Sequence, residues 1–179
     1  RLMTDNEEET VRTIIAYREV FKTHINDYKG RVVDSPGDNI LAEFVSITDA
    51  LQCAWDIQQE IKSKNSDLPE NRRMVFRIGI NIGDIIEEEG RIYGDGVNIA
   101  ARLEGMADQG GICISGAIYD QVKNRLSFEY EYMGRKTVKN IVEPVRVYRV
   151  KQVALVMDSK ATATKYSKKK PGLWLLSAV

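Results

Sequence analysis

Histidine is nearly absent from this chain of 179 residues, which has one histidine, two cysteines and a formal net charge of zero. The single histidine, His24, argues against a histidine zinc site and against a histidine general base. The sequence contains neither a GxxxxGK[ST] phosphate loop nor a GxSxG nucleophile elbow. A balanced charge argues against a general nucleic-acid binder, because such proteins normally carry a basic excess.

The two cysteines are too few for a disulfide framework. Cys53 lies in a helical pattern and Cys113 in a strand pattern, so we expect two buried free thiols and a reducing, cytoplasmic compartment. An apolar fraction of 43% and a charged fraction of 29% are typical of a soluble globular protein. The length suits one domain with an appendage.

Hydrophobic periodicity predicts helices separated by pairs of strands. Paired strands favour an α+β fold over a doubly wound parallel sheet. We therefore expect a ferredoxin-like, palm-type core with a mixed, mainly antiparallel sheet flanked by helices. The expected elements are a helix over 5–26, a hairpin within 30–44, a helix from Ser46, strands at 76–83 and 91–93, a helix after Gly96, a strand at 110–115, a helix to about Asn124, and strands near 128–133 and 145–150.

Glycines alternate with isoleucines in the strand expected at 76–83. Gly79 and Gly83 fall on the same face of that strand, because side chains alternate between the two faces. A glycine within a strand often marks the close approach of another backbone or of a ligand. We therefore expect something to pack closely on this face.

An asparagine and an arginine stand four residues apart in the stretch RIYGDGVNIAARLE. Asn98 and Arg102 share one helix face, because residues i and i+4 are neighbours on a helix. A guanidinium suits phosphate oxygens, and an amide can orient a sugar hydroxyl. The Gly-Asp-Gly turn before them would let an anion approach a helix N-terminus. The alternative is an ordinary solvated face with an arginine–glutamate pair.

The tip of the expected hairpin, PGDN at 36–39, is a second candidate. Asp38 would present an accessible carboxylate, and hard cations such as Mg²⁺ take oxygen ligands. The alternative is that Asp38 only shapes the turn, because Asp and Asn are common in turns for backbone reasons.

The last thirty residues differ from the rest in composition. Small and polar residues after position 150 indicate a linker. Three lysines at 168–170 then precede an apolar run with Trp174 near its start, a pattern typical of the cytoplasmic flank of a transmembrane helix. The alternative is a flexible basic end, since the run is much shorter than the roughly twenty residues that span a bilayer.

Five stretches together resemble the catalytic domain of class III adenylate and guanylate cyclases, especially bacterial ones. They occur in the family's order within residues 1–150, which we expect to form this domain, with 151–179 as linker and tail. The run GDGVNIAARLE is the most specific of these motifs. The stretches are GDNILAEF, FRIGINIGD, IYGDGVNIAARLE, GGICISGAIYDQV and KNIVEPVRVY.

The resemblance implies a homodimer with composite sites and two divalent ions, Mg²⁺ or Mn²⁺. The 3′-hydroxyl of a nucleoside triphosphate would attack the α-phosphorus, giving a 3′,5′-cyclic nucleotide and pyrophosphate. Asp38 matches the second of the family's metal aspartates, and Gly37 beside it is assigned to substrate binding. Asn98 matches the residue that orients the ribose, and Arg102 the arginine that stabilises the transition state.

Three features depart from the family pattern or match it loosely. Asp34 stands where adenylate cyclases often have a lysine, and Arg91 stands where ATP enzymes often have an aspartate, as if the two charges were exchanged. Lys139 is the nearest candidate for a phosphate-binding lysine, with a surface lysine as the alternative. The family's other metal aspartate lies on a strand that would precede Arg1, and without that strand we expect metal binding and the sheet to be compromised.

We therefore expect a nucleotide cyclase, with ATP favoured because most bacterial relatives use it. The alternatives are a cyclase that uses GTP and a degenerate domain that binds nucleotide or dimerises in order to regulate. A diguanylate cyclase is disfavoured, because the chain lacks a GG[DE]EF turn. The expected partners are a nucleoside triphosphate and a second copy of the chain, without nucleic acid. We expect a cytoplasmic domain that meets a membrane only through a segment after residue 170.

Overall fold

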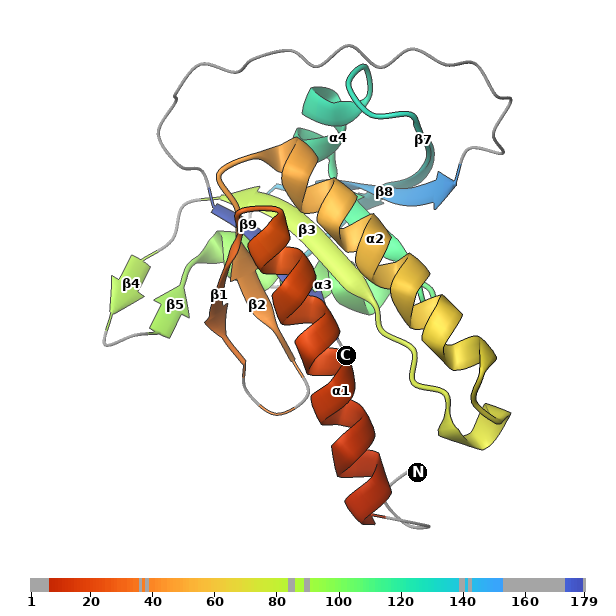
Figure 1. The fold of residues 1–179 in the computed structure, drawn as a ribbon. Coiled ribbons are helices and arrows are strands. Elements are labelled where there is room, and N and C mark those ends of the chain that lie inside the picture. Colours follow the sequence, from red (N-terminus) through yellow and green to blue (C-terminus); the bar gives the residue numbers. More distant parts are fainter. Residues whose placement is uncertain are drawn as a thin grey trace.

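A computed structural model gives the fold (Figure 1) and describes residues 7–35, 37, 39–83, 86–88, 91–138, 141, 143–152 and 173–178. Its helices are α1 (Glu7–Asp27), α2 (Ile47–Ser66), α3 (Asp95–Met106) and α4 (Gly116–Val122), with a 3-10 turn at Glu70–Arg72. Its strands are β1 (Arg31–Asp34), β2 (Leu41–Glu43), β3 (Ile78–Gly83), β4 (Ile86–Glu88), β5 (Arg91–Tyr93), β6 (Ile112–Ser115), β7 (Phe128–Lys136), β8 (Val145–Gln152) and β9 (Leu173–Ala178).

The described strands form one large sheet and a separate small ribbon. The large sheet has seven strands in the order β1-β2-β9-β3-β6-β8-β7, and β4 pairs with β5. In the large sheet only the β3–β6 pair is parallel among the described pairings. The predicted α+β class with a mixed, mainly antiparallel sheet is confirmed.

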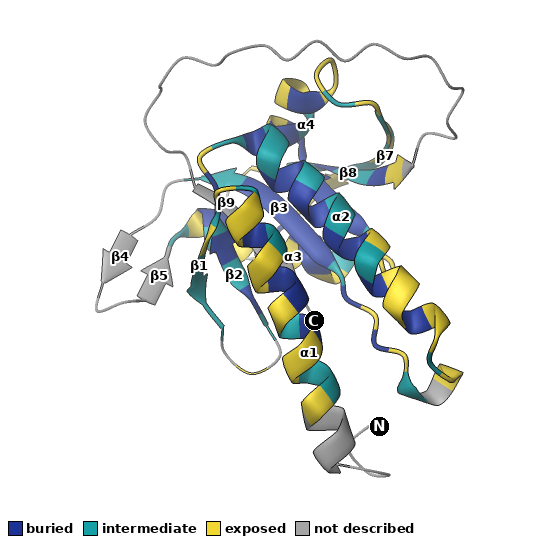
Figure 2. Cartoon of the chain, in the orientation of Figure 1, coloured by how far each residue is buried: buried dark blue, intermediate teal, exposed yellow. Residues whose placement is uncertain are grey.

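Helices cover both faces of the sheet (Figure 1). The main core cluster joins α1, α2 and α4 to one face of the sheet, where Phe21, Leu51 and Ile118 are fully buried. On the opposite face, Leu103 of α3 and Ala107, which follows the helix, pack against Cys113 of β6 and Val147 of β8. Figure 2 shows that β3 is buried along most of its length, whereas α2 has both buried and exposed residues.

Local sequence signals explain α2 well. Ser46 is its N-cap, and the Ser46 hydroxyl accepts a hydrogen bond from the backbone N–H of Asp49 at 3.2 Å. The apolar residues at helical spacing form the buried stripe, which consists of Ile47, Leu51, Ala54, Ile57 and Ile61. Burial of this stripe against the sheet, rather than helix propensity alone, holds the helix in place.

The two thiols are free and fully buried, as predicted. Burial raises the pKa of Cys53 to about 12 and the pKa of Cys113 to about 11. Both side chains therefore stay protonated near neutral pH and act as packing groups on the two faces of the sheet.

The expectation that the apolar end begins a membrane helix is wrong for residues 173–178. These residues form β9, which lies between β2 and β3. β9 pairs antiparallel with β3 from Gly83↔Leu173 to Ile78↔Ala178, and it meets β2 at Ala42↔Leu176. A short apolar strand satisfies the backbone groups of both neighbours, which would otherwise be open edges. In the described part of the chain, no helix is long and apolar enough to cross a bilayer.

β9 also bears on the expectation that the sheet would be compromised. In the described chain β2 and β3 have no direct pairing, and β9 joins them into one continuous sheet.

β4 is a second strand that the sequence does not predict. Its three residues (IEE) carry too few apolar side chains to give a period-two signal.

The close contact at Gly79 predicts that adding a single methyl group there destabilises the fold. A Cβ at Gly79 would lie 2.1 Å from the Ala100 carbonyl oxygen and 2.3 Å from the Glu104 nitrogen, both in the α3 backbone. We expect Gly79→Ala to lower the free energy of unfolding by about 1–3 kcal/mol through overpacking. Urea denaturation measures the difference.

Gly105→Ala is the matched control, because Gly105 lies in α3 and a Cβ added there would meet no atom within 4 Å. It should be neutral or stabilising by up to about 1 kcal/mol, as expected for alanine in a helix. Equal stability of Gly79→Ala and Gly105→Ala would contradict the tight contact between α3 and β3.

Candidate active site

Glycines let the start of α3 lie directly on β3. A Cβ at Gly83 would lie 2.7 Å from the Cα of Gly96, so only glycine allows this approach. Between the two strand glycines, the Asn81 amide donates a hydrogen bond to the Gly96 carbonyl at 3.2 Å. Gly94, before the helix, has a backbone φ of +145°, which residues with a side chain rarely adopt. The expectation of close packing on this face of β3 is confirmed, and the neighbour is a helix backbone.

An ion pair joins the last turn of α3 to Arg77, the residue just before β3. The Nε of Arg77 lies 3.0 Å from Oε1 of Glu104, and the Glu104 side chain is only 10% exposed. A carboxylate so far from solvent is costly unless a charge or a hydrogen-bond donor accompanies it. The pair therefore opposes sliding or rotation of α3 on the sheet.

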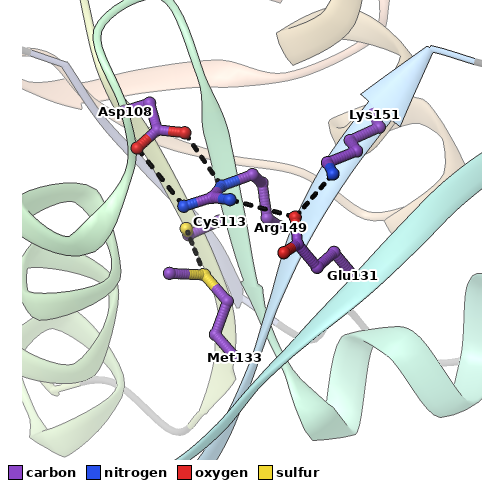
Figure 3. A network of polar contacts seen from close by, with 6 residues as sticks. All are labelled: Asp108, Cys113, Glu131, Met133, Arg149 and Lys151. Atoms are coloured by element: carbon purple, nitrogen blue, oxygen red, sulfur yellow. Dashed lines mark hydrogen bonds and ion pairs between the residues drawn. The ribbon is translucent and has the colours of Figure 1, made fainter.

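A second network holds the chain just after α3 (Figure 3). Arg149 of β8 binds Asp108 through Nε–Oδ2 at 2.9 Å and Nη2–Oδ1 at 3.3 Å. It also binds Glu131 of β7 at 2.9 Å, and Lys151 reaches the same carboxylate at 2.7 Å. Lys151, and then Arg149, lower the pKa of Glu131. The end of α3 is thereby tied to the β7–β8 hairpin.

The outer face of α3 carries the predicted amide and guanidinium. Asn98 and Arg102 are both exposed, one helical turn apart, as the i, i+4 spacing predicted. Ala101 and Gly105 on the same helix are exposed as well. The face presents two polar groups among small residues.

The predicted hairpin is confirmed as β1 and β2, and a residue of α1 holds its connecting loop. Arg18 donates from Nη2 to the Ser35 carbonyl at 3.5 Å and to the Gly37 carbonyl. The Ser35 hydroxyl donates to the Asn39 carbonyl at 3.2 Å across the loop. Gly37 is exposed with φ +59°. These contacts fix both sides of the tip, while Asp38 lies outside the described residues.

Two other predicted site residues lie on neighbouring strands. Asp34 ends β1, and its carboxylate accepts a hydrogen bond from the Ser35 N–H at 2.8 Å. Arg91 begins β5, which contacts β1. The backbones of the two residues therefore belong to adjacent elements, as a pair would require. The side chain of Arg91 and the whole of Lys139 lie outside the described part of the structure.

The hairpin and α3 also contact each other. Val33 of β1 and Leu41 of β2 pack against Ala100 of α3. The β1–β2 end of the sheet and α3 are thus in direct contact within one chain. Among the described residues, no group of three His, Cys, Asp or Glu side chains is placed to hold a metal.

Several residues whose contacts hold the elements of the candidate site were not identified from the sequence. Arg18, Arg77 and Arg149 each contact a partner far away in the chain, such as Asp108, which lies 41 positions from Arg149. No local pattern reports such pairs. His24 lies 2.7 Å from Glu60, whose pKa is lowered chiefly by that hydrogen bond.

The fold and the site define an α+β domain of ferredoxin-like type whose α3 presents an amide and a guanidinium beside a glycine turn. The family model for the adenylate and guanylate cyclase catalytic domain matches residues 2–152, and the chain belongs to this family. The resemblance noted in the sequence is thereby confirmed.

Individual relatives agree with the family. "Putative adenylate cyclase 3" of Rhizobium meliloti (strain 1021) is 41% identical over 149 residues, which are 83% of this chain and 25% of that protein. The chain thus spans a quarter of that relative's length. The crystal structure of an adenylate/guanylate cyclase/hydrolase from Silicibacter pomeroyi is 40% identical with a TM-score of 0.79, covering 86% of this chain and 90% of that one.

A more distant structure shares the fold. The adenylyl cyclase CyaB from P. aeruginosa has a TM-score of 0.64 at 21% identity, covering 84% of this chain and 83% of that one. At this identity the likeness concerns the fold alone.

The Arg77–Glu104 pair yields a stability prediction. In Arg77→Met the nearly buried Glu104 carboxylate loses the partner at 3.0 Å. We expect the free energy of unfolding to fall by about 1–3 kcal/mol, because the variant removes a positive charge that offsets the desolvation of this nearly buried carboxylate. Urea denaturation checks this.

Arg31→Met is the comparison variant. Arg31 pairs with Glu43 through the same atoms, Nε and Oε1, at 2.6 Å, but these side chains are 56% and 26% exposed. This change should cost about 1 kcal/mol or less, as expected for an exposed pair. If both variants lose the same small amount, the Arg77–Glu104 pair does not anchor α3.

Proposed function

We propose that this domain converts ATP to 3′,5′-cyclic AMP and pyrophosphate within a homodimer. The observation that carries the proposal is the exposed Asn98–Arg102 pair on a helix whose position is fixed by glycine contacts. Membership in the cyclase family supports it. The proposal extends that membership to a particular nucleotide, an assembly and a role for each residue.

Arg102 is assigned to the transition state. Phosphoryl transfer depends on positioning and charge neutralisation more than on covalent help from the protein. A guanidinium presents several N–H donors in a fixed fork, which suits the charge that develops on the phosphate oxygens. An exposed Arg102 on a rigid helix supplies this charge without moving the backbone.

Asn98 is assigned to the ribose. Its amide carries both a donor and an acceptor, so it can hold a sugar oxygen in one orientation. Since Asn98 lies one turn from Arg102, the helix sets the separation between the group on the sugar and the group on the phosphate. Correct orientation of the attacking 3′-hydroxyl toward the α-phosphorus is a large part of catalysis for such a reaction.

Asp38 is assigned as a metal ligand at the loop that Arg18 and Ser35 hold. A carboxylate is the ligand type that Mg²⁺ and Mn²⁺ prefer. Two bound ions would lower the pKa of the attacking hydroxyl and neutralise the leaving pyrophosphate. The Asp38 assignment rests on the family resemblance, as does that of Gly37 next to it to the substrate and that of Lys139 to a phosphate.

Base recognition is assigned to Asp34 and Arg91, on adjacent strands. A carboxylate accepts from the amino group of adenine, and a guanidinium donates to a ring nitrogen. The same two groups also fit guanine, whose edge offers N–H donors beside a carbonyl acceptor. ATP is proposed because the relative that is 41% identical is named as an adenylate cyclase.

The site is proposed to be composite. The hairpin loop of one chain would face the outer surface of α3 in its twin across a two-fold axis, so each dimer would contain two sites. Small exposed residues beside the pair, Ala101 and Gly105, leave room for a nucleotide or for the partner chain. A cytoplasmic location, where nucleoside triphosphates are available, fits two reduced thiols.

A regulatory domain without turnover is the second candidate. The observation that favours it is the exchanged charge at Asp34 and Arg91, relative to the usual lysine and aspartate of ATP enzymes. Such a domain would bind nucleotide or dimerise and make no cyclic product.

Incubation of the full-length protein with Mn²⁺ and either ATP or GTP, followed by product analysis, separates these candidates. Cyclic AMP from ATP is the expected result. We expect Arg102→Ala to lower kcat by about a thousandfold, as for related phosphoryl-transfer arginines, with little change in nucleotide binding.

Arg125→Ala is the control, because Arg125 is exposed after α4 on the opposite side of the sheet. It should leave turnover unchanged. If cyclic GMP is the only product, the substrate is GTP and not ATP. If neither nucleotide gives a cyclic product, the regulatory domain is favoured. Equal loss of nucleotide binding and turnover in Arg102→Ala would contradict its transition-state role.

A further inference from the structure

A cavity of about 730 Å³ lies beside the C-terminal half of α2. Its walls come from α2, from Arg73 and Val75 before β3, from Gln109–Ile112 and from the end of β8. Its lining includes none of the residues assigned to catalysis, and α2 covers the sheet face opposite α3. A volume of this size is typical of pockets for small organic ligands.

The charged residues that line this cavity are all cationic. Lys62, Arg73 and Lys151 contribute cationic groups, and no Asp or Glu is among its lining residues, all of which the structure describes. Lys151 is partly compensated by Glu131 at 2.7 Å. Arg73 donates from Nε to the Leu68 carbonyl at 2.9 Å, a neutral partner. A chain of zero net charge thus concentrates positive charge at one concave place.

Two of the lining residues, Trp55 and Gln58, are held by contacts of their own. Trp55 is half-buried, with its ring centroid 5.1 Å from that of Phe128. Gln58 is buried and donates to the carbonyls of Phe76 at 2.9 Å and Gly111 at 3.2 Å. These contacts hold Trp55 and Gln58 in place before any ligand arrives, which reduces the entropy lost on binding.

We propose that this cavity binds a small organic anion that carries a flat ring next to a phosphate or carboxylate group. Lys62 and Arg73 would meet the anionic group, and Trp55 would contact the ring. The anion would also compete with Glu131 for Lys151. Gln109–Gly111 in the lining directly follow Asp108, which Arg149 binds, so an occupant would touch the chain segment after α3.

Binding of phenyl phosphate to the full chain tests this proposal, with benzyl alcohol as the neutral ring control. Amide and indole NMR shifts report the place of binding. We expect phenyl phosphate to shift the signals of Trp55, Gly110 and Gly111, and benzyl alcohol to bind on the order of tenfold more weakly or worse, since it lacks the charge.

Charge reversal locates the anionic group. The double variant Lys62→Glu, Arg73→Glu should weaken phenyl phosphate binding on the order of tenfold or more. Both side chains are exposed, so the fold should tolerate the change. Lys64→Glu is the matched control on the same helix, because Lys64 is exposed, pairs with Glu60 and lies outside the cavity.

Three results would overturn the proposal. One is equal binding of phenyl phosphate and benzyl alcohol. Another is equal weakening by Lys64→Glu and by the double variant, which would indicate a general charge effect. The third is a set of shifts confined to α3 and the β1–β2 hairpin, which would place the anion at the proposed catalytic face. None of these outcomes depends on whether the domain is a cyclase.

Discussion

The close approach of two backbones, α3 against β3, is the constraint on which the rest of this structure depends. Gly79 and Gly83 leave one face of a central strand without side chains, and the helix backbone occupies that space. Asn81 of the same strand and Arg77, just before it, then bind Gly96 and Glu104 of the helix. Because a packed interior resists displacement, this contact fixes where the outward face of α3 can be.

A rigid α3 gives the proposed chemistry its geometry. Asn98 and Arg102 are exposed polar side chains, so their position depends on the helix that carries them. On the other side of the proposed site, Arg18 binds the hairpin loop to α1. Transition-state stabilisation requires groups that are already in place when charge develops, and both anchors serve this requirement.

The sequence predicted those parts that depend on local patterns. The stripe of α2, the existence of β3 and the exposed pair Asn98 and Arg102 follow from periods of 3.6 and 2 residues. The period of β3 indicated a half-buried strand, but Ile78 to Asn81 are all buried because α3 covers the second face. β9 could not be predicted this way, because a short apolar run reads equally as a buried strand or as part of a longer apolar helix. The contacts of Arg149 join segments that only the tertiary fold brings together. The roles of Asp34, Asp38, Arg91 and Lys139 came from family resemblance and remain predictions.

Complementation between two inactive chains tests the composite site most directly. Asp38→Asn removes the proposed metal carboxylate, and Arg102→Ala removes the proposed transition-state charge from the opposite side of the site. Each variant alone should be inactive, and an equal mixture should regain about a quarter of the wild-type activity, since half of the two-fold dimers would be mixed and each would contain one intact site. A mixture that stays inactive, although mass spectrometry detects the mixed dimer, would contradict a site shared between two chains.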